Sequence, residues 1–388
     1  MFLEILLAIL LGVLAGCFTG LIPGIHTNLI AASLAMISFE NTTFLVVFII
    51  AMSITHSFTN VIPSIFLGAP EPSTALNILP GHKMLMEGLG LNAIKLTLVG
   101  SMLGLLVCFL LYPILKVVIS ITYEFLSKNI ALLLLLIGIF LITRTKDIKS
   151  NAFIYLTAGI IGILVLNSKM ENPLFAMLSG FFGVSTLIFS LQNKSIIPKQ
   201  KVINFNYNPN KLSLALGTFS GFLTSILPGL GSSTAAAISS SIKKETETND
   251  FLFMMGSIST VNFFMSIAAL SVIEKARNGS IVAIMSITNQ YNIALMIAAS
   301  LISAGLALYS TIRISKIFQK IIVKVNYTYV VYIVILIIFI MSVLLSGISG
   351  LVVLFTCTAL GLYSNVKGTP RNLMMASIMV PVSLFFIF

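Results

Sequence analysis

Residues 12–32 read GVLAGCFTGLIPGIHTNLIAA, and residues 217–237 repeat the same pattern as GTFSGFLTSILPGLGSSTAAA. In each stretch two glycines lie four positions apart, a Pro-Gly pair follows, and a pair of alanines closes the pattern. Every matched position in the second copy lies 205 residues after its counterpart in the first. One glycine pair at this spacing is common in membrane helices, but two composite patterns in register indicate an internal repeat.

The composition places both copies in a membrane protein. Of the 388 residues, 58% are hydrophobic and 9% are charged, and the mean hydropathy is +1.09. A soluble domain carries about 25% charged residues, so this class is excluded. The apolar stretches are continuous runs without the alternation of barrel strands, and they therefore predict an all-α polytopic membrane protein.

The sequence predicts about ten transmembrane helices beside the two broken Pro-Gly segments, which cover residues 3–38 and 212–241. A basic connection at residues 192–211 separates an N-terminal repeat, 1–191, from a C-terminal repeat, 212–388. The ten expected helices lie near 43–66, 92–114, 130–143, 151–167, 172–191, 251–273, 290–312, 328–346, 349–363 and 372–388.

The direction of the two repeats follows from the number of crossings. If each Pro-Gly segment is a re-entrant hairpin, each repeat has five crossings, an odd number, and the repeats are inverted. Loops on one face then hold sixteen Lys and Arg, against five on the other. Basic loops mark the cytoplasmic side, so we expect a multi-pass protein of the cytoplasmic membrane. The net charge of +11 then reflects topology, and no nucleic-acid partner is expected.

The Pro-Gly breaks predict a substrate site near the middle of the membrane. Broken segments in corresponding places of two inverted repeats are typical of such a site, because freed backbone groups are tolerated where they line a cavity. The half-helix after each break presents N–H groups and a positive dipole end, which suit an organic anion. The expected substrate-binding residues are Pro23, Gly24, Thr27, Asn28, Pro228, Gly229, Gly231, Ser232, Ser233 and Thr234. A second interpretation is that the Ser, Thr and Asn side chains only cap the half-helices.

Two further stretches, with the doubled motif, resemble a known family. Residues 66–75 (FLGAPEPSTA), followed by 79–84 (LPGHKM), and residues 172–187 (NPLFAMLSGFFGVSTL) are similar to the large membrane subunit of tripartite tricarboxylate transporters, in its short, archaeal-looking branch. The resemblance implies secondary uptake of carboxylates, served by an extracytoplasmic binding protein and a small membrane subunit.

Weaker candidates lie in the helices and loop that follow the hairpins. Asn60 and Asn262 either join helices or contact the substrate or a coupling ion, and Ser73 and Thr74 lie in a Pro-rich stretch that either lines a vestibule or is a plain loop. The expected coupling ion is Na⁺, bound by oxygen ligands. The alternative is H⁺, for which His56 or His26 is a possible carrier, and His56 is otherwise a packing residue.

Enzyme functions lack their motifs. The chain has no HExxH, no G-x-S-x-G and no Walker loop, and its three cysteines lie far apart, so no enzyme, no cofactor and no metal site is expected. We therefore predict a symporter that moves a small organic anion across the bilayer by alternating access. The alternative is a transporter of an anionic lipid carrier such as polyprenyl phosphate, with Arg277 or Arg371 at the cavity mouth.

Overall fold

The computed structural model describes residues 2–387, except for 23–26, 36–40, 68–77, 146, 193–197, 202–206, 227–231, 233–234, 237–238, 240–246, 277 and 323–326. Within these described residues every regular element is a helix. The prediction of an all-α protein is confirmed.

Seven helices of the described chain are long and apolar enough to cross a membrane. They are α1 (Phe2–Leu21), α3 (Thr42–Thr59) continued by α4 (Val61–Phe66), α6 (Gly90–Leu110), α9 (Ile148–Leu166), α14 (Thr248–Ile273), α16 (Ile293–Ile322) and α17 (Tyr327–Lys367). Two shorter apolar segments follow: α10 (Pro173–Leu178), the π-helix η2 (Ser179–Val184) and α11 (Ser185–Gln192) form one, and the 3-10 helix η3 (Arg371–Met375) with α18 (Ala376–Ile387) forms the other. A multi-pass protein is confirmed, whereas the number of crossings stays a prediction.

Helix α17 is a folded-back pair rather than one long rod. Gly347 interrupts it with a φ of 68° and a ψ of −169°, a region that side chains with a Cβ avoid. The rings of Phe339 and Phe355 lie 6.3 Å apart on either side of the break, and Gly350 faces Ser342. The break therefore falls between the two stretches that the sequence predicted as separate spans, 328–346 and 349–363.

A pair of glycine substitutions tests this break. Replacing Gly347 by Ala should lower stability by about 1–2 kcal/mol, because an L-residue is strained at positive φ. Gly305 in α16 is the matched control, since nothing lies within 4 Å of an added Cβ at either glycine. Gly305→Ala should instead stabilise its helix by up to about 1 kcal/mol. Thermal unfolding in detergent measures both, and equal shifts for the two variants would contradict the hairpin geometry.

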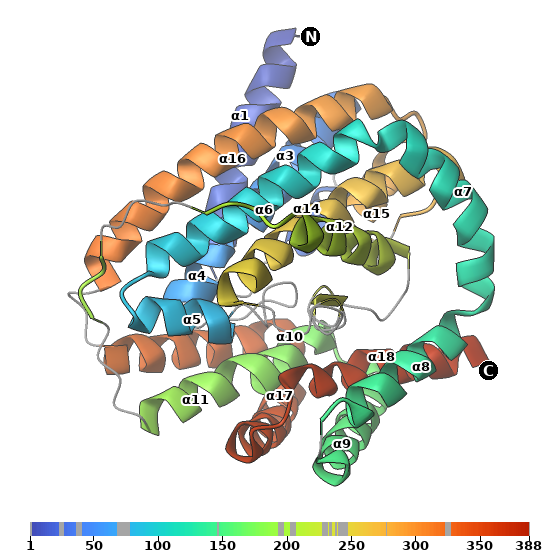
Figure 1. Ribbon diagram of the computed structural model, residues 1–388. Coiled ribbons are helices and arrows are strands. Elements are labelled where there is room, and N and C mark those ends of the chain that lie inside the picture. Colours follow the sequence, from blue (N-terminus) through green and yellow to red (C-terminus); the bar gives the residue numbers. More distant parts are fainter. Residues whose placement is uncertain are drawn as a thin grey trace.

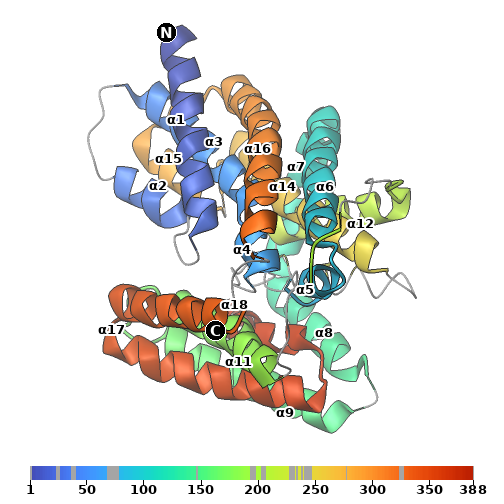
Figure 2. The ribbon, with the colours of Figure 1, turned by 90° about the vertical axis from the view of Figure 1, so that its left-hand side faces the viewer.

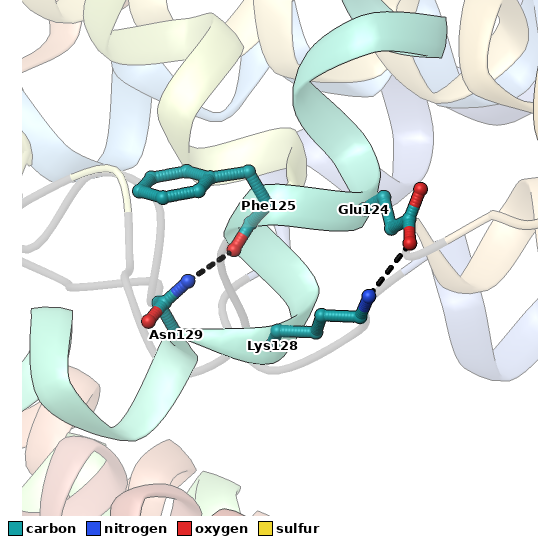
Figure 3. Close-up of polar contacts among 4 residues, drawn as sticks. All are labelled: Glu124, Phe125, Lys128 and Asn129. Atoms are coloured by element: carbon teal, nitrogen blue, oxygen red, sulfur yellow. Dashed lines mark hydrogen bonds and ion pairs between the residues drawn. The ribbon is translucent and has the colours of Figure 1, made fainter.

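A bend follows α6. Helix α7 (Tyr112–Lys128) has Pro113 in its first turn, where a proline is tolerated, and α8 (Ile130–Thr143) follows at an angle of 91°. Figure 3 shows the bend, where the Asn129 side-chain amide donates to the Phe125 carbonyl at 2.8 Å and Lys128 pairs with Glu124 at 2.6 Å. Both charged side chains are well exposed, so the pair adds little to stability.

The helices form two packed groups (Figures 1 and 2). One group contains α1, α3, α6, α14 and α16, and the other contains α8 to α11, α17 and α18. The two groups touch, because Leu187 of α11 and Val334 of α17 belong to the same buried cluster as the first group. Within each group the two sequence halves interleave. In the first, α3 packs against α16 and α6 packs against α14; in the second, α18 packs against α8 and α9, and α17 packs against the α10–η2–α11 segment. Each half therefore completes its core with helices of the other.

The basic connection at residues 192–211 is fixed at two described points. The Gln200 side chain accepts from the Gly90 backbone N–H at 3.0 Å and donates to the Leu85 carbonyl, in α5 (Ile78–Met86). Farther along, the Tyr207 hydroxyl donates to Asp250 of α14 at 2.6 Å. Burial and this hydrogen bond raise the pKa of Tyr207, so the phenol remains a neutral donor at physiological pH.

Candidate functional site

Helix α1 packs against α3 through its glycine face. A Cβ on Gly12 would press against Ala51, one on Gly16 against Thr55, and one on Gly20 against Thr59. The contacts advance along both helices together, so α1 and α3 run parallel. Only residues without a side chain allow this approach, which explains the glycine spacing in the first copy of the motif.

The second copy packs in the same way. Helix α12 (Lys211–Ile226) lies parallel to α14, with Gly217 against Ser257 and Gly221 against Val261. Ser257 therefore takes the place of Ala51, and Val261 takes that of Thr55. The correspondence between the halves thus extends beyond the quoted motif into the helix that each glycine face contacts.

This alignment pairs two polar residues that the sequence pattern did not pair. His56 follows Thr55 in α3, and Asn262 follows Val261 in α14, so they occupy equivalent positions. His56 is buried and Asn262 is half-buried. His56 contacts the last turn of α1, and Asn262 contacts the last turn of α12; each of these turns precedes a Pro-Gly pair.

The partners of these two residues are also equivalent. The Thr19 hydroxyl donates to the Gly16 carbonyl at 3.2 Å and is hydrogen-bonded to His56 Nδ1 at 3.1 Å. In the second copy the Thr224 hydroxyl donates to the Gly221 carbonyl at 2.9 Å and accepts from Asn262 Nδ2 at 2.8 Å. Since Thr19 and Thr224 also lie 205 residues apart, the repeat includes this threonine and the group that binds it.

Of the first set of expected substrate-binding residues, Thr27 and Asn28 lie at the start of α2 (Thr27–Ala35). Thr27 is buried. Asn28 Oδ1 accepts from the Ser280 backbone N–H at 3.0 Å and from the Ser280 hydroxyl at 3.1 Å. Asn28 thus helps to cap α15 (Gly279–Ile287), a helix of the other half, rather than the half-helix to which it belongs.

Of the second set, Ser232 is described and is half-buried. Ala235 and Ala236, in the small-residue part of the motif, are buried. Among the weaker candidates, Asn60 is buried at the end of α3, and Asn262 has the position given above. The remaining expected residues lie outside the described part of the chain: Pro23, Gly24, Pro228, Gly229, Gly231, Ser233, Thr234, Ser73 and Thr74.

Sequence reasoning missed Thr19 and Thr224. Their equal offset was visible in the two quoted stretches, but a lone threonine near the end of an apolar run carries no signal of its own. Among the described residues, no group of three His, Cys, Asp or Glu side chains is placed to hold a metal ion.

Comparison with known proteins identifies the family of this chain. A distant relative, an uncharacterized protein of Methanocaldococcus jannaschii, is 31% identical over 378 residues, which cover 94% of each chain. No solved structure matches the chain. The sequence profile described as the tripartite tricarboxylate transporter TctA family matches residues 6–376, nearly the whole length. The chain therefore belongs to the tripartite tricarboxylate transporter TctA family, a family of transporters.

Proposed function

We propose that the protein is a secondary active transporter that moves a carboxylate-class organic anion across the cytoplasmic membrane by alternating access. The anion is held at the N-termini of the two half-helices that follow the Pro-Gly pairs. Membership of the family supports a tricarboxylate-type substrate, a small membrane subunit and an extracytoplasmic binding protein as partners. The observation that carries the proposal is the equivalent packing of the two motif copies, each bound through its threonine to the next helix.

The directions of the helices support an inverted arrangement of the repeats. Gly100 faces Phe253 and Gly104 faces Ser257, so α6 and α14 run parallel. Helix α3 ends at α4, which packs against α5 and the start of α6, and α3 and α6 run in opposite directions (Figures 1 and 2). Helix α14 is therefore opposed to α3, its counterpart in the first half. Opposed counterparts are what an axis in the membrane plane produces.

Cysteine labelling tests this topology. In a variant without the native cysteines, single cysteines at Thr42 and Asn278 should react with an impermeant reagent added outside intact cells. Cysteines at Lys146 and Lys199 should react only after the membrane is opened. Labelling of positions 199 and 278 from the same side would rule out inverted repeats. The native cysteines to be replaced are Cys17, Cys108 and Cys357.

Transport itself is tested with purified protein in sealed vesicles. Citrate, smaller dicarboxylates and a polyprenyl phosphate are offered in turn, with and without a sodium gradient. Saturable uptake of a carboxylate that depends on the gradient supports the proposal. Movement of the lipid phosphate without carboxylate uptake would favour the alternative substrate class.

A further inference from the structure

Arg371 is a buried arginine at the first position of η3, with 6% of its surface exposed. The turn before it follows from the sequence Gly368-Thr369-Pro370. Gly368 ends α17 with a φ of 65°, and the Thr369 backbone N–H donates back to the Ser364 carbonyl. Pro370 is the N-cap residue of η3 and its ring fixes φ, so the arginine side chain projects from a rigid turn into the second group of helices.

One nitrogen of the guanidinium is held by the π-helical segment. Arg371 Nη2 donates to the Phe182 carbonyl at 3.0 Å and to the Thr186 hydroxyl, and the guanidinium lies 5.7 Å from the centroid of the Phe182 ring. The segment η2 packs closely on α17, where Gly361 meets the Phe181 carbonyl. Short π-helical turns occur frequently at functional sites.

The other nitrogens are buried without a partner. Arg371 Nε and Nη1, which carry three N–H donors, have no hydrogen-bond partner in the described part of the chain. The neighbouring Asn372 is 3% exposed, and its Nδ2 likewise has none there. No carboxylate of the described residues forms an ion pair with Arg371. A buried charge in a membrane protein is costly unless it is paired, and such a residue is therefore a candidate for function.

The position of this group relates it to the second hairpin. Ala235, in the small-residue stretch after the second Pro-Gly pair, belongs to the same buried cluster as Leu373 and Met374. These two residues follow Arg371 and Asn372 in η3. The unpartnered donors therefore lie in the helix group that Ala235 joins, whereas its neighbour Ala236 packs with Met254 and Met255 of α14.

We propose that Arg371 and Asn372 form an anion site that receives a carboxylate group of the transported substrate. Because Nε–H and the Nη1–H bonds point to different sides of the guanidinium, a carboxylate accepts a charge-assisted hydrogen bond from one of them, which neutralises one negative charge. The neighbouring Asn372 Nδ2 is a further donor without a partner among the described residues. The inference rests on the proposed function, because it names the residues that recognise the substrate. It adds a side-chain cation to a site that sequence reasoning built from backbone dipoles alone.

Binding to purified protein tests the site. Wild-type protein should bind citrate, and Arg371→Gln should raise the Kd about 100-fold, because a buried carboxylate loses its charged partner. Arg371→Lys keeps the charge without the fork and should lie between the two. Arg313→Gln, which removes an exposed arginine stacked on Tyr309, is the matched control and should leave the Kd unchanged.

A measurement on the unmodified protein avoids misfolded variants. An arginine-specific dicarbonyl reagent modifies the protein with or without citrate, and peptide mass spectrometry follows each site. Citrate should slow modification of Arg371 at least several-fold and leave that of Arg313 unchanged. The neutral trimethyl ester of citrate should protect neither residue.

The outcomes separate this inference from the proposed function. If wild-type protein binds no carboxylate, the proposed function fails. If it binds citrate, but Arg371→Gln binds equally well and citrate does not protect Arg371, the inference fails while the function stands. Arginine-dependent binding of a polyprenyl phosphate alone would assign the site to a lipid phosphate. Restored citrate binding in Arg371→Gln combined with Glu40→Gln, Glu71→Gln or Glu245→Gln would make the arginine an internal counter-ion instead.

Discussion

Gly229→Leu is expected to abolish carboxylate uptake by sealed vesicles while the protein still inserts into the membrane. A leucine side chain in the second Pro-Gly pair fills space that a glycine leaves free beside the backbone. It also blocks the N–H groups that, in the proposed function, hold the anion at the start of the half-helix. The loss of two such hydrogen bonds to a charged ligand corresponds to a decrease of about 100-fold or more in affinity.

Two further variants test the same site, and a third is the control. Gly24→Leu makes the equivalent change in the first copy, and Pro23→Ala restores a backbone N–H at the break; both should also abolish uptake. Gly305→Ala, in open space within α16, should leave uptake at the wild-type level. Membrane-inserted protein is quantified for each variant. Normal uptake by Gly229→Leu would make the second hairpin structural and would move the substrate site elsewhere.

The helical class and the membrane location followed from the sequence, because long apolar runs have few other solutions. The structure adds that the glycines of the doubled motif, Gly12, Gly16, Gly217 and Gly221, all contact a neighbouring helix. The pairing of α3 with α16 and of α6 with α14 could not be predicted. An apolar face shows that a helix is buried, but it does not identify the helix that buries it.

The polar residues show the same limit. The sequence pairs Asn60 with Asn262, because both are amides in spans that follow a hairpin, yet the structure makes His56 the counterpart of Asn262. The register of α3 on α1 and of α14 on α12 decides this, and it depends on which turns of the two helices touch. The sequence suggests only a cavity mouth for Arg371, because no pattern around it indicates that its side chain is buried.

The difference between His56 and Asn262, which occupy equivalent positions, indicates where a coupling ion binds. A tricarboxylate carries three negative charges, two half-helix N-termini offer about +0.5 each, and Arg371 offers one positive charge. About one negative charge is left, which a co-bound cation would neutralise. Asn262 is placed to help, because its Nδ2 is committed to Thr224 and its amide oxygen is the remaining group. His56, at the equivalent position, has no oxygen, so we propose that a Na⁺ site lies in the second repeat alone.

Substitutions at the two positions are therefore expected to have unequal effects on sodium coupling. Asn262→Ala and Asn262→His should each raise the sodium concentration for half-maximal uptake about tenfold, the equivalent of about 1.4 kcal/mol for one lost ligand. His56→Ala and His56→Asn should leave that concentration within about twofold of wild type, a difference of about 0.4 kcal/mol. Uptake into vesicles at a series of sodium gradients and fixed pH measures all four variants. Uptake that is driven by a pH gradient without sodium and is lost in His56→Ala would reverse the assignment, because the proton would then be carried by the imidazole in the first repeat.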